Sequence, residues 1–291
     1  MLPSDDTLAF VSRPLLGAVA FLLGAIVGSF INVVIYRLPK MMETSWRQQC
    51  QQFLGISSAS AKEAMNLAFP ASHCPHCQHP IAWWENIPVI SYLWLRGKCS
   101  HCKCAIPFRY LSIEGLSALL SFVVVWTMGY SSATLAALFL TWVLLTLAVI
   151  DLDTQLLPDD ITLPLIWLGL CLNLYHVFIS LDQAVIGAIS GYLVLWSVYW
   201  AFKLLTRKEG MGFGDFKLLS ALGAWFGWQA LPLILLLSSC VGSLVGISLM
   251  VVKKKDSQTP IPFGPYLAMA GWIYLLWGER LVHWYVSTYT H

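Results

Sequence analysis

Residues 133–150 read ATLAALFLTWVLLTLAVI, and this stretch of 18 residues without a charge decides the fold. A helix of roughly 20 apolar residues crosses about 30 Å of hydrocarbon, so the stretch is typical of a membrane-spanning helix. The whole chain has the same character: 58% of its 291 residues are hydrophobic, only 11% are charged, and its mean hydropathy is +0.69. These values exclude an ordinary soluble domain.

Eight apolar runs of this kind follow one another along the chain. The predicted spans are residues 14–36, 111–129, 133–150, 161–180, 184–204, 215–229, 230–252 and 262–285. The first run is too long and too poorly flanked by positive charge for a cleavable signal, so we expect it to be an anchor. Only Gly227, Trp228 and Gln229, at the end of the sixth run, mark a turn before the seventh. We therefore predict an all-α polytopic membrane protein with about eight transmembrane helices.

The basic residues lie on one side of this arrangement. With eight spans, four loops share a face: residues 37–110, 151–160, 205–214 and 253–261. These loops and the residues at their edges hold 15 of the 17 Lys and Arg, and only Arg13 and Arg280 lie opposite. Because cytoplasmic loops carry an excess of Lys and Arg, this face is predicted to be cytoplasmic. The net charge of only +2 gives no reason to expect a nucleic-acid partner.

Only one loop is long enough to form a domain. We predict an N-terminal transmembrane anchor in residues 1–36, a cytoplasmic domain in residues 37–110, and a transmembrane domain in residues 111–291. The second half of the cytoplasmic loop is rich in cysteine, which directs attention to metal or redox chemistry.

Two C-x-x-C motifs in that loop indicate a zinc site. Cys74 and Cys77 are followed, after 21 intervening residues, by Cys99 and Cys102. Each motif turns two thiolates toward one point, and two such motifs complete a tetrahedral four-thiolate zinc site. A disulfide or redox use of the cysteines is the alternative, which reducing cytoplasmic conditions disfavour. Further residues could substitute as ligands: His73, His76, His79, His101 and Cys104.

Four thiolates would fill the coordination sphere of zinc and leave no position for a reacting water. The metal is therefore expected to be structural, and hydrolytic chemistry is expected elsewhere.

Two acidic residues at predicted membrane boundaries are the candidates for that chemistry. Asp151 ends the third span, and Asp215 begins the sixth within Gly212-Phe213-Gly214-Asp215. Two spans separate them, so both are expected at the cytoplasmic edge. Two carboxylates in a poorly hydrated site share one proton, so one can activate water while the other donates to a substrate carbonyl. Gly212 and Gly214 would let a substrate backbone approach Asp215.

Other polar residues near the boundaries have competing interpretations. Asp153 is the alternative to Asp151, whereas Asp159 and Asp160 are expected only to favour the start of the following helix. Glu114 and Asn32 lie within predicted spans, where polar residues serve either function or interhelical packing.

Nearly the whole chain resembles the type IV prepilin peptidases, within the membrane aspartyl proteases that share a Gly-x-Gly-Asp motif. The motifs that carry the resemblance are Gly28-Ser29-Phe30-Ile31-Asn32-Val33, Arg37-Leu38-Pro39, both C-x-x-C motifs, Asn86-Ile87-Pro88, Ser91, Leu95-Arg96-Gly97, Arg109-Tyr110, Glu114, Asp151, Leu157-Pro158-Asp159, residues 212–217 and Pro262-Phe263-Gly264-Pro265. The catalytic aspartates of the family fall on Asp151 and Asp215. Its zinc-binding cysteines fall on Cys74, Cys77, Cys99 and Cys102.

The resemblance implies a bifunctional enzyme of the bacterial inner membrane. Such an enzyme removes the leader of type IV prepilins or type II secretion pseudopilins at the cytoplasmic face, cutting after Gly and typically before Phe. It then methylates the new N-terminal amine with S-adenosylmethionine, whose contacts are expected in residues 37–110. Besides its substrates, membrane lipid is the expected partner.

Two other classes of protein compete with this interpretation. A proton-coupled carrier would also place acids in the membrane, but its acids belong at the midplane, not at one edge. A membrane thiol oxidoreductase would use the C-x-x-C motifs and would bind no metal.

Overall fold

A computed structural model describes residues 5–55, 66–74, 76–208, 211–253 and 262–289. Within these ranges the regular structure is helical, and the only β-pairing consists of two isolated bridges, His73 with Pro80 and Lys98 with Ala105. The predicted all-α class is confirmed for this part of the chain. The predicted loop 253–261 lies outside the described residues except for its first residue.

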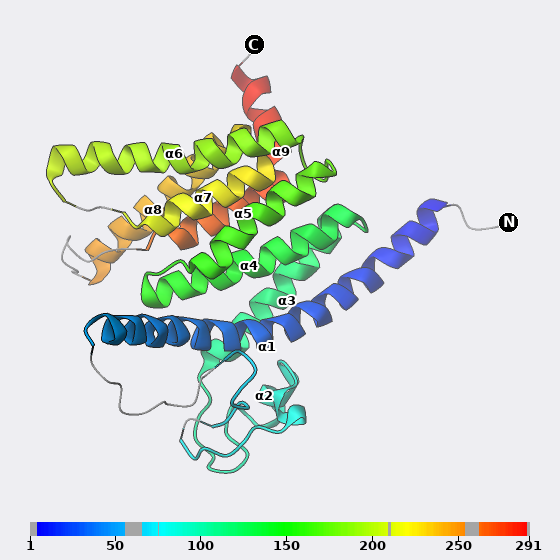
Figure 1. The fold of residues 1–291 in the computed structure, drawn as a ribbon. Coiled ribbons are helices and arrows are strands. Elements are labelled where there is room, and N and C mark those ends of the chain that lie inside the picture. Colours follow the sequence, from blue (N-terminus) through cyan, green and yellow to red (C-terminus); the bar gives the residue numbers. More distant parts are fainter. Residues whose placement is uncertain (1–4, 56–65, 75, 209–210, 254–261, 290–291) are drawn as a thin grey trace. The chain divides into compact units, whose positions relative to one another are not determined.

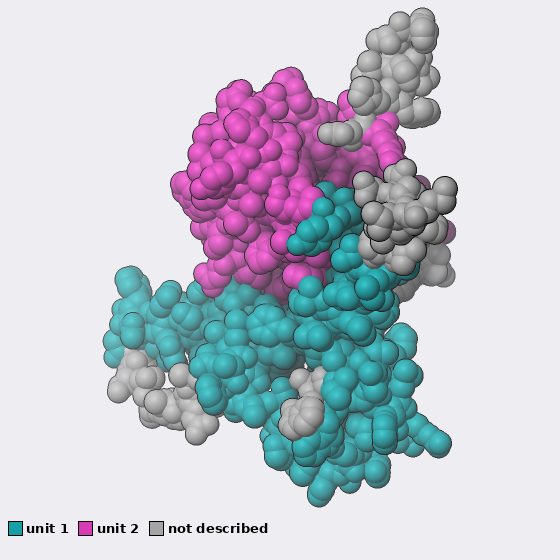
Figure 2. All heavy atoms as spheres, turned by 90° about the vertical axis from the view of Figure 1, so that its right-hand side faces the viewer, with its two compact units in different colours: residues 1–130 teal, residues 131–291 magenta. Residues whose placement is uncertain are grey.

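The chain divides into two compact units, residues 1–130 and residues 131–291, coloured separately in Figure 2. The first unit holds α1 (Asp5–Phe53), the short helices η1 (Trp83–Asn86) and α2 (Ile90–Trp94), and α3 (Phe108–Met128). The second holds α4 (Ser132–Thr154), α5 (Asp159–Leu174), α6 (Leu181–Thr206), α7 (Phe213–Phe226), η2 (Trp228–Ala230), α8 (Leu231–Lys253) and α9 (Gly264–Tyr289). Figure 1 labels the principal helices.

Among the described residues, five helical segments are long and apolar enough to cross a membrane. They are Arg13–Phe53, Phe108–Met128, Ser132–Thr154, Leu181–Thr206 and Trp228–Val251. The predicted count of eight spans is not confirmed. Helices α5 and α7 have only 16 and 14 residues, fewer than the roughly 20 that a bilayer requires, and α9, although 26 residues long, is not among the five. A polytopic membrane protein nevertheless follows from the five.

Helix α1 is longer than the sequence predicted. The first span was expected to end at residue 36, whereas α1 continues to Phe53 through Pro39. One proline removes one intrahelical hydrogen bond, and the polar residues that follow it favour a helix. A side-chain ion pair between Glu43 and Arg47, 3.0 Å apart, supports this exposed extension.

In the first unit α1 packs closely against α3. A Cβ atom at Gly28 would lie 2.8 Å from the Cα of Glu114, and one at Gly24 would lie 2.7 Å from the carbonyl oxygen of Ser117. The hydroxyl of Ser117 donates a hydrogen bond of 2.7 Å to the carbonyl of Gly24. Small residues at these positions therefore let the two backbones approach, as is usual between membrane helices.

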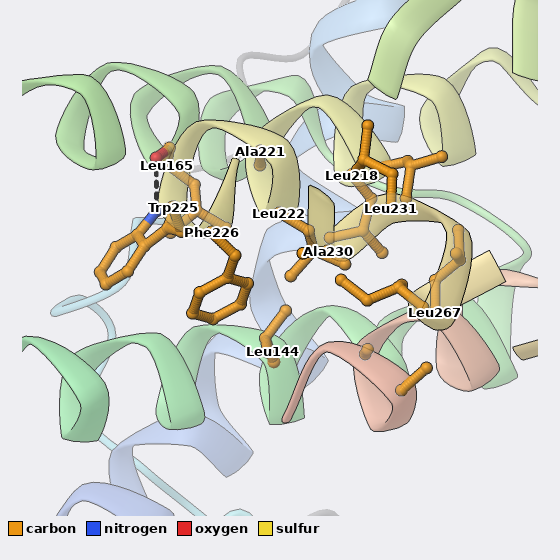
Figure 3. Close-up of a cluster of buried hydrophobic side chains, with 14 of the residues drawn as sticks. Leu144, Leu165, Leu218, Ala221, Leu222, Trp225, Phe226, Ala230, Leu231 and Leu267 are labelled. Atoms are coloured by element: carbon orange, nitrogen blue, oxygen red, sulfur yellow. Dashed lines mark hydrogen bonds between the residues drawn. The ribbon is translucent and has the colours of Figure 1, made fainter. Parts of the chain in front are cut away.

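The second unit is built around α7. Every residue from Asp215 to Phe226 except Lys217 is buried, and α7 packs against α5, α6, α8 and α9. A helix that is apolar on all sides belongs inside a protein, which explains how this short helix is retained. Figure 3 shows its side chains meeting Leu144 of α4 and Leu267 of α9, with the indole N–H of Trp225 donating to the carbonyl of Leu165 at 3.0 Å.

Helix α5 ends six residues earlier than predicted, at Leu174 rather than at residue 180. The cause is Asn173, which is fully buried. Its carboxamide oxygen accepts hydrogen bonds from the N–H groups of Phe178 and Ile179, and its nitrogen donates to the carbonyl of Ala224 at 2.9 Å. These bonds stabilise a turn where hydropathy alone predicted more helix.

Candidate active site and metal centre

Asp151 lies in the last turn of α4 and is only 5% exposed. Its Oδ2 accepts a hydrogen bond of 3.0 Å from the backbone N–H of Gly264, the first residue of α9. The next residue, Pro265, has no N–H and cannot donate a hydrogen bond. The N–H of Gly264 is therefore the backbone donor that the carboxylate meets at the start of α9. The carboxylate thus lies at the N-terminal, electropositive end of α9.

Asp215 lies in the first turn of α7, with Gly212 preceding the helix, and is 7% exposed. A negative charge on this carboxylate is repelled by one on Asp151. The structure therefore brings the two sequence-predicted acids together in one unit, both buried.

Leu157 links the surroundings of the two acids. A Cβ atom at Gly214 would lie 2.7 Å from the Cβ of Leu157, and one at Gly264 would lie 3.2 Å from its Cδ1 and 2.6 Å from Oδ2 of Asp151. The space beside Gly214, which the sequence suggested for a substrate backbone, is occupied by this leucine. Gly212 leaves more room, because a Cβ there would be 4.0 Å from Oδ2 of Asp215.

Neighbouring acids occupy different surroundings. Asp153 is exposed, unlike Asp151, and this difference in burial favours Asp151 as the site residue. Asp159 forms an ion pair with Lys217, whose Nζ lies 2.6 Å and 2.7 Å from the two carboxylate oxygens. Sequence analysis missed this pair, although Asp159 directly follows Pro158 and Lys217 lies two residues after Asp215.

The four cysteines of the C-x-x-C motifs converge on one point. The Sγ atoms of Cys74, Cys77, Cys99 and Cys102 all lie within 4.8 Å of one another, and each of the eight cysteines of the chain is a free thiol. Among the described residues this is the cluster of ligand atoms that could hold a metal ion, and it includes neither Cys104 nor a histidine.

The two motifs fold alike. The N–H of Gln78 donates to the carbonyl of Cys74 at 2.9 Å, and the N–H of Lys103 donates to that of Cys99 at 3.1 Å. Gln78 and Lys103 have φ angles of 58° and 59°, so the backbone turns back directly after the second cysteine of each motif. The equivalence of the two turns explains why four sulfur atoms meet.

The spacing of the sulfur atoms fits zinc. Cys74 and Cys102 are 3.8 Å apart at Sγ, and Cys77 and Cys99 are 4.0 Å apart. Four thiolates at about 2.3 Å from a tetrahedral Zn²⁺ are separated by about 3.8 Å. Backbone N–H groups, that of Cys77 first, lower the pKa of the Cys74 thiol, and the N–H of Cys102 does the same for Cys99. The backbone N–H of His79 acts in the same direction on Cys77, but burial and the neighbouring thiols outweigh it and raise the pKa of Cys77 to about 12.

Comparison with known proteins agrees with this division of the chain. Residues 22–128 match the bacterial peptidase A24 N-terminal domain, and residues 138–247 match the type IV leader peptidase family. A prepilin leader peptidase/N-methyltransferase of Aeromonas hydrophila is 56% identical over 273 residues, 94% of this chain and 94% of that relative. The chain belongs to the type IV leader peptidase family.

Other relatives of the type IV leader peptidase family carry the same name. That of Pseudomonas aeruginosa is 55% identical over 91% of this chain and 92% of its own length, and that of Legionella pneumophila is 43% identical over 90% and 91%. No solved structure matches the chain. The cysteine cluster lies in the part that matches the N-terminal domain, and both aspartates lie in the part that matches the leader peptidase family.

Proposed function

We propose that this protein removes the leader peptide from type IV prepilins or type II secretion pseudopilins and then methylates the new N-terminal amine. The observation that carries the peptidase half is the burial of Asp151 and Asp215 together in one unit, within electrostatic reach of each other. The methyltransferase half rests on the names of the relatives, which include N-methyltransferase.

The two aspartates divide the work of hydrolysis. One carboxylate takes a proton from water as the water oxygen attacks the scissile carbonyl, and the protonated partner donates to the carbonyl oxygen. The tetrahedral intermediate then breaks its C–N bond, and the amine leaves with a proton. Burial strengthens the interaction of both groups with the developing charge. Cleavage after Gly and before Phe belongs to the same proposal, as does an active site at the cytoplasmic face of the inner membrane.

Cys74, Cys77, Cys99 and Cys102 would hold Zn²⁺ in a structural site, since four protein thiolates leave it no open position. S-adenosylmethionine would supply the methyl group, and we place its contacts in residues 37–110. The metal would hold the two C-x-x-C turns together and so order this segment.

The test is incubation of the purified protein in detergent with a prepilin and S-adenosylmethionine, followed by mass measurement of the product N-terminus. The wild type is expected to give a shortened, methylated product. Asp151→Asn and Asp215→Asn are each expected to lower cleavage at least about 1,000-fold, because neither amide can exchange the proton that hydrolysis requires. Asp153→Asn is the matched control and should cleave normally. Normal processing by either of the first two variants would overturn the assignment.

A further inference from the structure

Helix α2 exposes apolar side chains that no described residue of the first unit covers. None of its residues is buried, and Ile90, Leu93 and Trp94 are 57%, 64% and 84% exposed. The surrounding segment, residues 87–95, contains no charge. A contiguous apolar surface of this kind marks a site of contact with another apolar phase or partner.

The helix is amphipathic despite its length. Tyr92 is half-buried and turns toward the cysteine-containing segment, where a Cβ atom at Gly97 would lie 2.9 Å from its hydroxyl oxygen. That hydroxyl donates to the carbonyl of Ile106 at 3.4 Å. The side of α2 that bears Tyr92 therefore faces its own unit, and Ile90, Leu93 and Trp94 face outward.

The start of α2 is tied to the transmembrane pair. The N–H of Val89 donates to Oε2 of Glu114 in α3 at 2.9 Å, and the N–H of Ile90 closes a tight turn onto the carbonyl of Pro88. Val89 has a φ of 62°, a conformation that is unfavourable for a β-branched residue. The bond to Glu114 holds this turn in place.

The position of Glu114 along α3 shows how deep the start of α2 lies relative to the ends of the two membrane helices. Glu114 lies beside Gly28, and the side chain of Asn32 donates to the carbonyl of Tyr110 at 3.1 Å, so α1 and α3 run antiparallel. Glu114 is five residues inside α3 from Arg109, about 7 Å along the axis. Gly28 is nine residues inside α1 from Arg37, about 13 Å. Val89 is thus hydrogen-bonded to a group that lies deeper along both helices than Arg109 and Arg37, the nearest basic residues toward the loop, and Figure 1 shows α2 beside α1 and α3.

We infer that α2 is embedded in the lipid bilayer, with Ile90, Leu93 and Trp94 in contact with acyl chains. Its apolar side would continue the exposed surface of α3, to which Phe108, Leu116 and Leu119 contribute at 67%, 43% and 52% exposure. Tryptophan beside basic residues is typical of the membrane interface, and Arg96 and Lys98 follow α2 directly. The second C-x-x-C motif, which starts at Cys99, would then be held against the membrane surface.

The experiment places a fluorescent non-natural amino acid at position 93 of the full-length protein, in vesicles of phosphatidylethanolamine and phosphatidylglycerol. Brominated acyl chains are expected to quench this probe at least about twofold, as membrane-buried groups are quenched. A probe at position 119 of α3 is the lipid-facing control. A probe at Ser45, on the exposed extension of α1, is the aqueous control and should respond only to iodide.

The hydrogen bond between Val89 and Glu114 is tested with Glu114 variants in the same vesicles. Glu114→Gln keeps an acceptor oxygen and should retain quenching at position 93, whereas Glu114→Leu should reduce it while quenching at position 119 is unchanged. A probe at position 93 that behaves like the one at 45 overturns the inference. So does a probe shielded from both lipid and iodide, since a protein partner would then cover α2.

Discussion

The carboxylate of Asp151 depends on one backbone donor, the N–H of Gly264. A methyl group at position 264 would lie 2.6 Å from Oδ2, well inside van der Waals contact, and would displace the carboxylate. We expect Gly264→Ala to lower the rate of leader cleavage about 100-fold, because a shift of about 1 Å in a catalytic group has this effect. Cleavage of a prepilin by the purified variant measures it.

Gly115→Ala is the matched control for that substitution. A Cβ atom at Gly115 in α3 would meet no atom within 4 Å, so this variant should cleave at the wild-type rate. If Gly264→Ala also cleaves normally, the close packing of Gly264 on Asp151 has no catalytic importance.

The ion pair of Lys217 with Asp159 joins the first turns of α7 and α5. Side-chain exposures of 25% and 54% leave it well solvated, so we expect a coupling free energy below about 1 kcal/mol. A double-mutant cycle of Lys217→Gln and Asp159→Asn, measured by reversible unfolding in detergent, gives this value. The pair of Glu43 and Arg47 is the comparison, with exposures of 67% and 71% and an expected coupling of about 0.3 kcal/mol. A coupling of several kcal/mol would mean that the Lys217 pair is shielded from water.

At the scale of elements, Asn173 holds the end of α5 against the end of α7. Asn173→Ala would leave the N–H groups of Phe178 and Ile179 and the carbonyls of Ala224 and Trp225 without this partner. Buried groups that lose a hydrogen bond are costly, so we expect the free energy of unfolding to fall by about 2 to 4 kcal/mol. Ser190→Ala, which removes an exposed hydroxyl bonded within its own helix, should change it by less than about 0.5 kcal/mol. Equal effects of the two substitutions would contradict this role for Asn173.

Hydropathy predicted which segments are helical better than it predicted where they end. The turn at Gly227 was expected and is present, with a φ of 82° that favours glycine. The end of α5 was missed because it depends on Asn173, whose partners lie up to 52 residues away. The extension of α1 was missed because it is polar, and apolar runs carry no information about a helix that continues into water.

The same distinction applies to the candidate sites. Spacing alone identified the four cysteines, because the geometry of each C-x-x-C turn is local. Asp151 and Asp215 were also proposed from sequence, but not the placement of Leu157 between Gly214 and Gly264. That contact joins three segments far apart in the chain, so no periodic or spacing pattern could show it.

At the scale of the whole molecule, the two candidate sites fall in different units. The cysteine cluster lies in residues 1–130, and both aspartates lie in residues 131–291 with Gly264 and Leu157. Each unit has its own set of helix contacts, so loss of order in the first need not disturb the buried acids of the second. The two activities in the names of the relatives should therefore be separable.

Replacing the cysteines tests this separation. Cys74→Ser with Cys77→Ser removes two of the four thiolates, so we expect bound zinc to fall below about one-tenth of the wild-type content, since two thiolates cannot complete the site. Methylation should be lost with the order of the segment, whereas cleavage should stay within about threefold of wild type, because the acids lie in a separately packed unit. Zinc content by mass spectrometry and the product mass after incubation with a prepilin report the three quantities independently. Cys50→Ser, an exposed thiol outside the cluster, is the control and should change none of them. Cleavage abolished to the level of Asp215→Asn would show that the peptidase requires an intact cysteine segment, and undiminished zinc would show that the metal is bound elsewhere.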